Sequence, residues 1–279
     1  MAGMKKRILS ACVMVPALIL IIMLPYANHL AFTILATIAS LLGSLEMHAL
    51  LSKDNTELSF LAYSGFLFPV SQYIQYSFFP ESGLTFFVLM FIMGLVFTIE
   101  VFKGAKDDFK LTWERNCKTL LNVIYPGLFA SFLVRISFLE NAEAWLLLFF
   151  ITVCGSDSFA YFIGMVFGRT NKGVVKVSPN KSVAGFLGGI ICPAVISMLV
   201  VLLMPSTFPI SPVGGFFLGF YTSLTGTCGD LIESSFKRSA GVKDSGTLIM
   251  GRGGVMDTID SIVMAAPAYC AIVLFTLYI

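Results

Sequence analysis

The chain has 279 residues, of which 57% are hydrophobic and only 12% are charged, and its mean hydropathy is +0.89. This composition exceeds what a soluble core can bury, so it excludes a water-soluble globular domain and indicates a membrane protein. The formal net charge is only +2, and the six cysteines are scattered without metal-ligand or redox spacing, which argues against a cysteine-based metal or redox site.

A membrane-spanning helix needs about 20 mostly apolar residues, and the sequence contains nine such stretches. In chain order they are residues 8–26, 29–51, 57–79, 83–102, 115–139, 144–168, 185–205, 212–236 and 257–279. The first stretch follows three basic residues, but no small-residue cleavage site separates it from the second, so we expect a retained helix. The predicted fold is all-α, a polytopic membrane helix bundle with about nine transmembrane helices.

The basic residues predict how these helices are oriented. If the helices alternate in direction, the N-terminus shares one side with Lys53 and with residues 103–118, 169–181 and 237–252, and only Arg135 lies on the other side. By the positive-inside rule, the N-terminus is then cytoplasmic and the C-terminus is outside. The predicted location is the cell (inner) membrane, with a multi-pass chain whose active site faces the cytoplasm.

The ionisable residues divide the chain into two parts. Residues 1–112 carry few of them inside the predicted helices, chiefly Glu46, His48 and Glu100, and we expect N-terminal scaffold helices there. Glu46 is open to a functional role, but its place near a cytoplasmic helix end lets its charge reach water, which favours the scaffold interpretation. Residues 113–279 are predicted to hold the polar site in their helices and cytoplasmic loops.

Polar residues enter the helices themselves from Ser156 onward. Asp157, Tyr161, Gly164 and Gly168 recur at helical spacings and therefore share one helix face. In one interpretation the two glycines form a small-residue helix contact and Asp157 finds a hydroxyl partner. In the other, Asp157 faces a ligand in a polar cavity, because an unpaired acid within a membrane is costly.

A basic stretch over residues 169–189 precedes the seventh predicted helix. It contains four cations, a turn signal at Ser178-Pro179 and several glycines. A helix that begins near Ser182 would direct its free N–H groups and positive dipole end toward a phosphate. Lys181 is well placed for the same phosphate, whereas the alternative is a basic loop that lies on anionic lipid.

Four carboxylates border the last loop. Asp230 and Glu233 share a helix face with Lys237, and Asp257 and Asp260 repeat the three-residue spacing at the start of the ninth predicted helix. Carboxylate oxygens near a phosphate suit Mg²⁺, which shares its oxygen ligands with substrate phosphates. The four acids are therefore the predicted metal ligands, with room for a second cation. The alternative is an ion-pair network with the neighbouring cations.

The last loop and its flanks also carry a long pattern of fixed spacing. Its members are Ser234, Phe236, Lys237, Arg238, Lys243, Asp244, Gly246, Gly253, Gly254, Asp257 and Asp260. This pattern resembles the signature of the phosphatidate cytidylyltransferases (CDP-diacylglycerol synthases). The resemblance extends upstream over most of residues 155–262, at Asp157, Ala160, Tyr161, Gly164, Gly168, Ser178, Pro179, Lys181, Ser182, Gly185, Gly229, Asp230 and Glu233.

The resemblance implies that CMP is transferred from CTP to phosphatidate, giving CDP-diacylglycerol and pyrophosphate in phospholipid synthesis. It implies catalytic roles for Asp230, Lys237, Lys243 and Asp257. Substrate-binding roles fall to Asp157, Ser178, Lys181, Ser182, Arg238, Asp244, Arg252, Gly253 and Gly254. The expected partners are CTP, the phosphatidate lipid and the bilayer, with no nucleic acid, and a homodimer is compatible with this assignment.

The chain departs from the family pattern in three places. Met250-Gly251-Arg252-Gly253-Gly254 stands where the family usually has Pro-Gly-His-Gly-Gly, Thr258 replaces an Arg, and Ala184 replaces a common Glu. Arg252 can bind phosphate but cannot exchange a proton at neutral pH. Either Arg252 supplies the charge missing at position 258, or the chain is a paralogue with weakened or altered activity. Because all four carboxylates remain, we favour an active enzyme.

Two other functions are open to such a sequence. An ion-coupled transporter or channel would use the carboxylates as an ion pathway, but it would place polar residues along the full depth of several helices. A CTP-dependent lipid kinase would transfer the terminal phosphate and release CDP in place of pyrophosphate.

Overall fold

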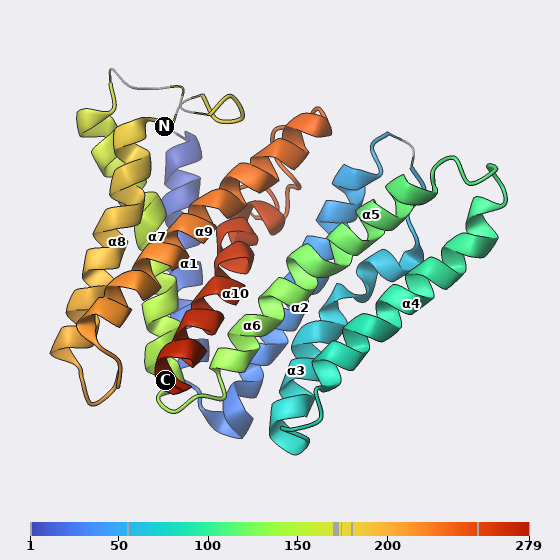
Figure 1. Ribbon diagram of the computed structural model, residues 1–279. Helices are drawn as coiled ribbons and strands as arrows, with labels where there is room; N and C mark the ends of the chain where they lie inside the picture. The colour runs from blue at the N-terminus through green and yellow to red at the C-terminus, as the bar shows by residue number, and fades with distance from the viewer. Residues whose placement is uncertain are drawn as a thin grey trace. The chain divides into compact units, whose positions relative to one another are not determined.

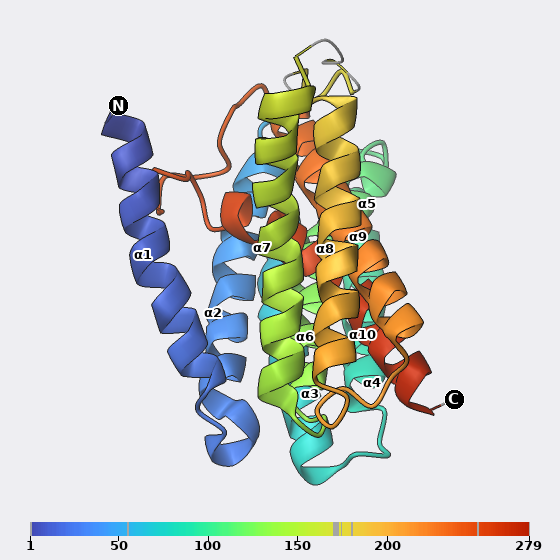
Figure 2. The same cartoon turned by 90° about the vertical axis from the view of Figure 1, so that its left-hand side faces the viewer.

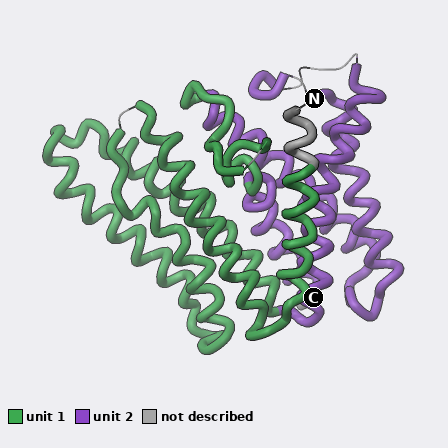
Figure 3. The backbone as a smooth tube through the Cα atoms, turned by 180° about the vertical axis from the view of Figure 1, so that it is seen from behind, with its two compact units in different colours: residues 1–138, 239–259 green, residues 139–238, 260–279 purple. Residues whose placement is uncertain are grey.

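The computed structural model describes residues 2–54, 56–169, 173, 175–179, 181–249 and 251–278. Over these ranges the chain forms helices and connecting turns, with an isolated bridge between Ile249 and Gly253 in place of any regular strand. The all-α prediction is therefore confirmed. The chain divides into two compact units (Figure 3), the first formed by residues 1–138 and 239–259 and the second by residues 139–238 and 260–279. The predicted functional division at residue 112 stays a prediction.

Each predicted apolar stretch corresponds to helical structure. In the first unit the elements are α1 (Ala2–Ile22), α2 (Tyr26–Leu51), the 3₁₀ segment η1 (Phe60–Phe66), α3 (Leu67–Phe78), α4 (Leu84–Gly104), α5 (Thr112–Val123), the π turn η2 (Ile124–Leu128) and α6 (Phe129–Ile136). The second unit contains α7 (Ala142–Phe167), α8 (Val183–Leu203) and nearly all of α9 (Pro212–Ser239) and α10 (Met256–Tyr278).

Six helical segments among the described residues are long and apolar enough to cross a membrane, so the chain is a multi-pass membrane protein. The other predicted spans differ for physical reasons. Residues 57–79 divide into η1 and a 12-residue α3, whose length of about 18 Å is shorter than a bilayer core. α9 has 28 residues but contains hydroxyl and charged side chains, and the apolar part of α1 is Leu9–Ile22. Nine crossings and their orientation stay predictions.

The core of the first unit lies among α3, α4 and α5. The buried side chains of Phe68, Ile92, Val96 and Val123 pack together there, and α3 runs beside both α4 and α6 (Figure 1). The segment from α5 to α6 is continuous across η2, which holds Pro126. A proline removes a helical hydrogen bond, and the wider π turn accommodates this loss within one span.

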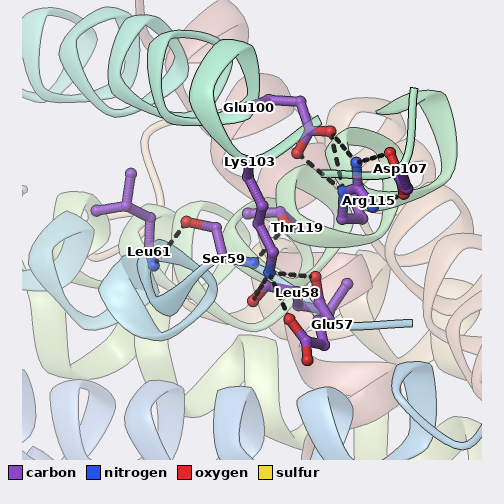
Figure 4. A network of polar contacts seen from close by, with 9 residues as sticks. All are labelled: Glu57, Leu58, Ser59, Leu61, Glu100, Lys103, Asp107, Arg115 and Thr119. Atoms are coloured by element: carbon purple, nitrogen blue, oxygen red, sulfur yellow. Dashed lines mark hydrogen bonds and ion pairs between the residues drawn. The ribbon is translucent and has the colours of Figure 1, made fainter. Parts of the chain in front are cut away.

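Polar contacts fix the ends of α4 and α5 (Figure 4). The Arg115 guanidinium contacts Glu100 at 2.6 Å and Asp107 at 2.5 Å, and the Arg115 and Glu100 side chains are each only 7% exposed. The hydrogen bond from Arg115 holds the pKa of the Asp107 carboxyl below its usual value. Lys103 of α4 donates to the carbonyl oxygens of Glu57 (2.7 Å) and Leu58 (3.2 Å). Charge pairing thus stabilises this helix end.

In the second unit, α7 and α8 lie side by side over much of their length (Figure 2). Glycines permit this close approach, since a Cβ added at Gly189 would lie 2.9 Å from Ala160 Cβ. α10 joins α7 through the Tyr269 hydroxyl, which donates to the Trp145 carbonyl at 2.7 Å. α9 packs against α10 at Gly229, where an added Cβ would lie 2.6 Å from the Asp260 carbonyl oxygen. These contacts place α7, α8, α9 and α10 in one bundle.

Candidate active site

A cavity of about 380 Å³ lies in the second unit, between α7, the beginning of α8, and α9. Its polar lining consists of Asp157, Tyr161, Lys181, Ser182, Thr227 and Asp230. All of these except Tyr161 and Thr227 were predicted from sequence as site residues. The remaining wall is apolar and includes Met165 and Phe186, so the cavity can receive a ligand that has both an anionic and an apolar part.

The start of α8 is built by a turn and a helix cap. The Lys181 N–H donates to the Ser178 carbonyl at 3.1 Å, which closes the turn expected at Ser178-Pro179. The Ser182 side chain then accepts a hydrogen bond from the Gly185 N–H at 3.1 Å, so it caps the helix that the sequence predicts to begin near this residue. Lys181 therefore stands directly before a helix N-terminus, where two sources of positive potential favour an anion.

Lys181 forms an ion pair with Asp230 in the cavity wall. The two side chains are 31% and 33% exposed, respectively, so water weakens their attraction and the pair can exchange for other partners. An incoming phosphate would compete with the Asp230 carboxylate for the ammonium group. The pair thus presents a cation that is already directed into the cavity.

The glycines of α7 and α8 let the two helices enclose this cavity. A Cβ added at Gly185 would lie 2.7 Å from the Ala160 carbonyl oxygen, and one at Gly164 would lie 3.1 Å from Ser182 Oγ. The small-residue contact expected from the sequence is present, and Asp157 lines the cavity on the same helix. The two interpretations of this helix face therefore describe different parts of one arrangement.

Carboxylates from three helices gather in the second unit. Asp260 of α10 is 7% exposed and lies within electrostatic range of Asp157 on α7 and of Asp230 and Glu233 on α9. Glu233 is fully buried and forms an ion pair with Lys237, one turn further along α9. Like charges repel strongly where water is scarce, so this arrangement favours a cation near Asp230 and Asp260.

In the first unit, Asp257 organises the loop between α9 and α10. Its Oδ2 atom accepts hydrogen bonds from the Ser245 N–H (2.8 Å), the Ser245 hydroxyl (2.8 Å) and the Gly254 N–H (2.7 Å). The Ile249 N–H donates to the Gly253 carbonyl at 2.8 Å, which closes a tight turn that contains the exposed Arg252. The loop therefore has a defined shape.

Glu46 of α2 contacts the same loop, although it lies far from the loop in the sequence. Its carboxylate accepts hydrogen bonds from the N–H groups of Val255 (3.0 Å) and Met256 (2.8 Å), and it lies 3.2 Å from the Ser245 hydroxyl. The sequence favoured a scaffold role for Glu46 and left a functional role open. The sequence signal for its role is an acid at the end of an apolar helix. Its hydrogen-bond partners lie 199 to 210 residues further along the chain, so the sequence does not identify them.

Comparison with known proteins identifies the family of this chain. The model of the cytidylyltransferase family matches residues 5–276. The chain belongs to the cytidylyltransferase family. It is therefore an enzyme that transfers a nucleotidyl group, as the loop signature led us to expect.

Similar proteins include three bacterial phosphatidate cytidylyltransferases. The one from Bacillus subtilis is 32% identical, and the alignment covers 99% of this chain and 100% of the relative. The one from Thermotoga maritima is 29% identical, over 96% of this chain and 95% of the relative. The one from Aquifex aeolicus is 35% identical, over 56% of this chain and 58% of the relative.

The predicted site residues are distributed over both compact units. The second unit holds Asp157, Ser178, Lys181, Ser182, Asp230, Glu233, Lys237, Arg238 and Asp260, and the first holds Lys243, Asp244, Arg252, Gly253, Gly254 and Asp257. Lys243, Asp244, Arg238 and Arg252 are exposed. Met250, one of the departures from the family pattern, lies outside the described residues. The convergence of all four predicted metal carboxylates stays a prediction.

Proposed function

We propose that the chain is a phosphatidate cytidylyltransferase, which transfers the CMP group of CTP to phosphatidate. The observation that carries this proposal is the cavity of the second unit, where Lys181 and a helix N-terminus stand beside the carboxylates of Asp157 and Asp230. Relatives that align with nearly the whole chain bear this enzyme's name. The amphipathic character of the cavity suits a lipid whose headgroup is a phosphate.

The proposed reaction is a single in-line displacement. An oxygen of the phosphatidate phosphate forms a bond to the α-phosphorus of CTP, while the bond from that phosphorus to the oxygen that bridges to the β-phosphate breaks. Pyrophosphate leaves with the electron pair of the broken bond, and no covalent enzyme intermediate is needed. Because both reactants are anions, the enzyme must chiefly neutralise charge and align the reacting groups.

The residues of the second unit divide this work. Lys181 and the N-terminus of α8 bind the lipid phosphate, and Lys181 exchanges Asp230 for that phosphate as the substrate enters. Ser182 keeps the helix start in place through its cap. Asp157 borders the same cavity, where it orients the bound headgroup. The acyl chains remain in the bilayer.

The carboxylate cluster of the second unit fits a magnesium ion. Among the described residues, no three acidic, histidine or cysteine side chains are already arranged around a metal position. Mg²⁺ does not require such a cage, because it commonly takes one or two carboxylates and completes its shell with water and substrate phosphates. Asp230 and Asp260 would hold it, with Glu233 beside them. When bound, the ion would neutralise charge on the triphosphate and on the departing pyrophosphate.

The loop of the first unit is proposed to bind the nucleotide. Lys243 and Arg252 are exposed cations that can contact phosphate, and Asp244 orients them. The N–H groups of Gly253 and Gly254 donate to the Ile249 carbonyl (3.1 Å) and to Asp257 Oδ2 (2.7 Å), so these two glycines help to shape the turn that holds Arg252. Asp257, which we predicted as a metal ligand and catalytic residue, accepts three hydrogen bonds from the loop at one oxygen. Its proposed contribution therefore includes holding the loop in shape.

The proposal places the reaction at the cytoplasmic face of the inner membrane. Basic residues border the site, whereas Arg135 stacks on the Tyr76 ring at 3.8 Å, away from these loops in the sequence. Nine crossings, with a cytoplasmic N-terminus and an external C-terminus, would put the nucleotide loop on the side that holds CTP. A second cation and a homodimer stay predictions.

The test uses purified protein in lipid vesicles with CTP, Mg²⁺ and phosphatidate. We expect equal amounts of pyrophosphate and CDP-diacylglycerol, and no product after chelation of Mg²⁺. Asp260→Asn should lower kcat by about a hundredfold or more, because it removes one charge from the proposed metal site. Lys181→Ala should raise KM for phosphatidate about tenfold or more. Lys106→Ala is the matched control, since Lys106 is exposed and far in sequence from the cavity residues.

Other products would contradict the proposal. Release of CDP together with a newly phosphorylated lipid would identify a lipid kinase. Ion flux without any nucleotide product would indicate a transporter or channel. Full activity of Asp260→Asn would show that the acidic cluster takes no part in the reaction.

A further inference from the structure

The Glu46 carboxylate caps the first turn of α10, although the two segments are separated by about two hundred residues of sequence. Glu46 and residues 239–259 belong to the same compact unit (Figure 3). Glu46 Oε1 accepts from the Val255 N–H at 3.0 Å, and Oε2 accepts from the Met256 N–H at 2.8 Å. Each oxygen thus receives its own backbone donor.

This arrangement satisfies donors that a helix cannot satisfy itself. α10 begins at Met256, and the first N–H groups of a helix have no partner within it. A carboxylate at this position also interacts favourably with the positive end of the helix dipole. Glutamine has a single acceptor oxygen, and its NH₂ group would meet one N–H donor face to face. The cap therefore requires a carboxylate.

Ser245 connects Glu46 to Asp257. The Ser245 hydroxyl lies 3.2 Å from Glu46 Oε2 and 2.8 Å from Asp257 Oδ2. One hydroxyl proton serves one acceptor at a time, so the carboxylates of Glu46 and Asp257 share the Ser245 hydroxyl as a donor. The Asp257 N–H in turn donates to Ser245 Oγ at 3.3 Å. A displacement of Glu46 would therefore reach Asp257 through one side chain.

The glycines of the loop match the position of Glu46. A Cβ added at Gly246 or Gly254 would lie 2.8 Å or 2.7 Å from Glu46 Cδ, respectively, and would overlap the carboxylate oxygens. Neither glycine has a positive φ, so conformational freedom does not explain them. Close approach of the glutamate side chain does. Two residues of the family-like loop pattern are thus glycines where Glu46 lies against the backbone.

We propose that Glu46 is a positioning residue for cytidylyl transfer. It touches no reacting group but fixes the start of α10 and the loop of residues 245–257, and it thereby orients Arg252 and Asp257 toward the nucleotide. This inference rests on the proposed function of the same loop. It extends that function to a residue of the N-terminal helices, which were expected to serve as scaffold.

The experiment compares Glu46→Gln with wild-type full-length protein in vesicles that contain phosphatidate. The variant removes a hydrogen bond to a charged group, so kcat/KM for CTP should fall about ten- to hundredfold. KM for phosphatidate should change less than twofold, because Glu46 is not among the residues that line the cavity. Glu81→Gln is the matched control: it is the same substitution at an exposed position, and it should leave both parameters unchanged.

A second pair of variants tests the contact itself. Gly246→Ala should reduce kcat/KM for CTP at least tenfold in the wild-type background, because its Cβ meets the carboxylate. In the Glu46→Ala background the space of the carboxylate is empty. Gly246→Ala should then reduce kcat/KM for CTP by less than a further threefold. Simple loss of stability would give two independent, additive effects.

The outcomes separate this inference from the function on which it rests. Wild-type protein that makes no CDP-diacylglycerol would refute the proposed function. The positioning role alone would be overturned if the wild-type protein is active and kcat/KM of Glu46→Gln for CTP stays within twofold of it. Equal losses of kcat/KM for CTP and for phosphatidate would overturn it as well. If Glu46→Gln does not fold, Ser245→Ala is tested in its place. For the inference to stand, Ser245→Ala must raise KM for CTP while its unfolding midpoint stays at the wild-type value.

Discussion

Replacing Arg115 with methionine should destabilise the first unit strongly. The guanidinium donates to both oxygens of Glu100, at 2.9 Å and 3.1 Å from Nε and at 2.6 Å from Nη2 (Figure 4). Both side chains are 7% exposed. Methionine fills much of the same volume but leaves the Glu100 charge without its main partner in a place that water scarcely reaches.

The magnitude follows from which charge remains buried. Removing one partner of a buried ion pair typically costs about 3–5 kcal/mol, because the other charge stays desolvated. Asp107, the second partner of Arg115, is 28% exposed and can be hydrated instead, so we assign it no additional cost. Replacing both members of the buried pair, as in Glu100→Leu with Arg115→Met, should cost less than about 1 kcal/mol, since no charge is then left unpaired.

The assay is equilibrium unfolding in mixed detergent micelles, followed by far-ultraviolet circular dichroism. Lys110→Met is the matched control, because the ion pair of Lys110 with Asp108 spans 4.0 Å and is largely exposed, and such pairs contribute about 0–1 kcal/mol. A free energy of unfolding for Arg115→Met within about 1 kcal/mol of wild type would refute the reasoning. So would a double variant that is no more stable than Arg115→Met alone.

Two further predictions concern stability. Gly127→Ala should destabilise the protein by about 1–3 kcal/mol, because its Cβ would lie 2.5 Å from Gly65 Cα. Gly94→Ala is the control, since nothing lies within 4 Å of its Cβ, and it should leave the unfolding midpoint unchanged. Equal midpoints for the two variants would contradict this prediction. Arg115 holds the pKa of the Asp107 carboxyl below its ordinary value of 3.8. The contribution of Asp107 to the free energy of unfolding should therefore be fully present above pH 3.8 and be lost as the pH falls through the lower pKa of the folded protein. An acid titration in which Asp107→Asn loses as much stability as the wild type would disprove this.

Local features of the chain were predictable from sequence because they depend on neighbouring residues. The apolar stretches 29–51 and 83–102 correspond to α2 (Tyr26–Leu51) and α4 (Leu84–Gly104), since hydropathy and helical hydrogen bonding are set within a single segment. The turn at Ser178 and the helix start near Ser182 depend on hydrogen bonds that reach only three residues along the chain. The loop signature likewise indicated the family, which the comparisons then confirmed.

Tertiary structure decided the features that depend on distant partners. The stretch 57–79 was predicted as one span, yet the structure divides it into η1 and α3. Lys181 and Asp230 are 49 residues apart and pair in one cavity, and Glu46 reaches the backbone at Met256 across 210 residues. Hydropathy and spacing report only which residues enter a helix and which face they share. Which faces then meet is fixed by how glycines and bulky side chains of different helices fit together.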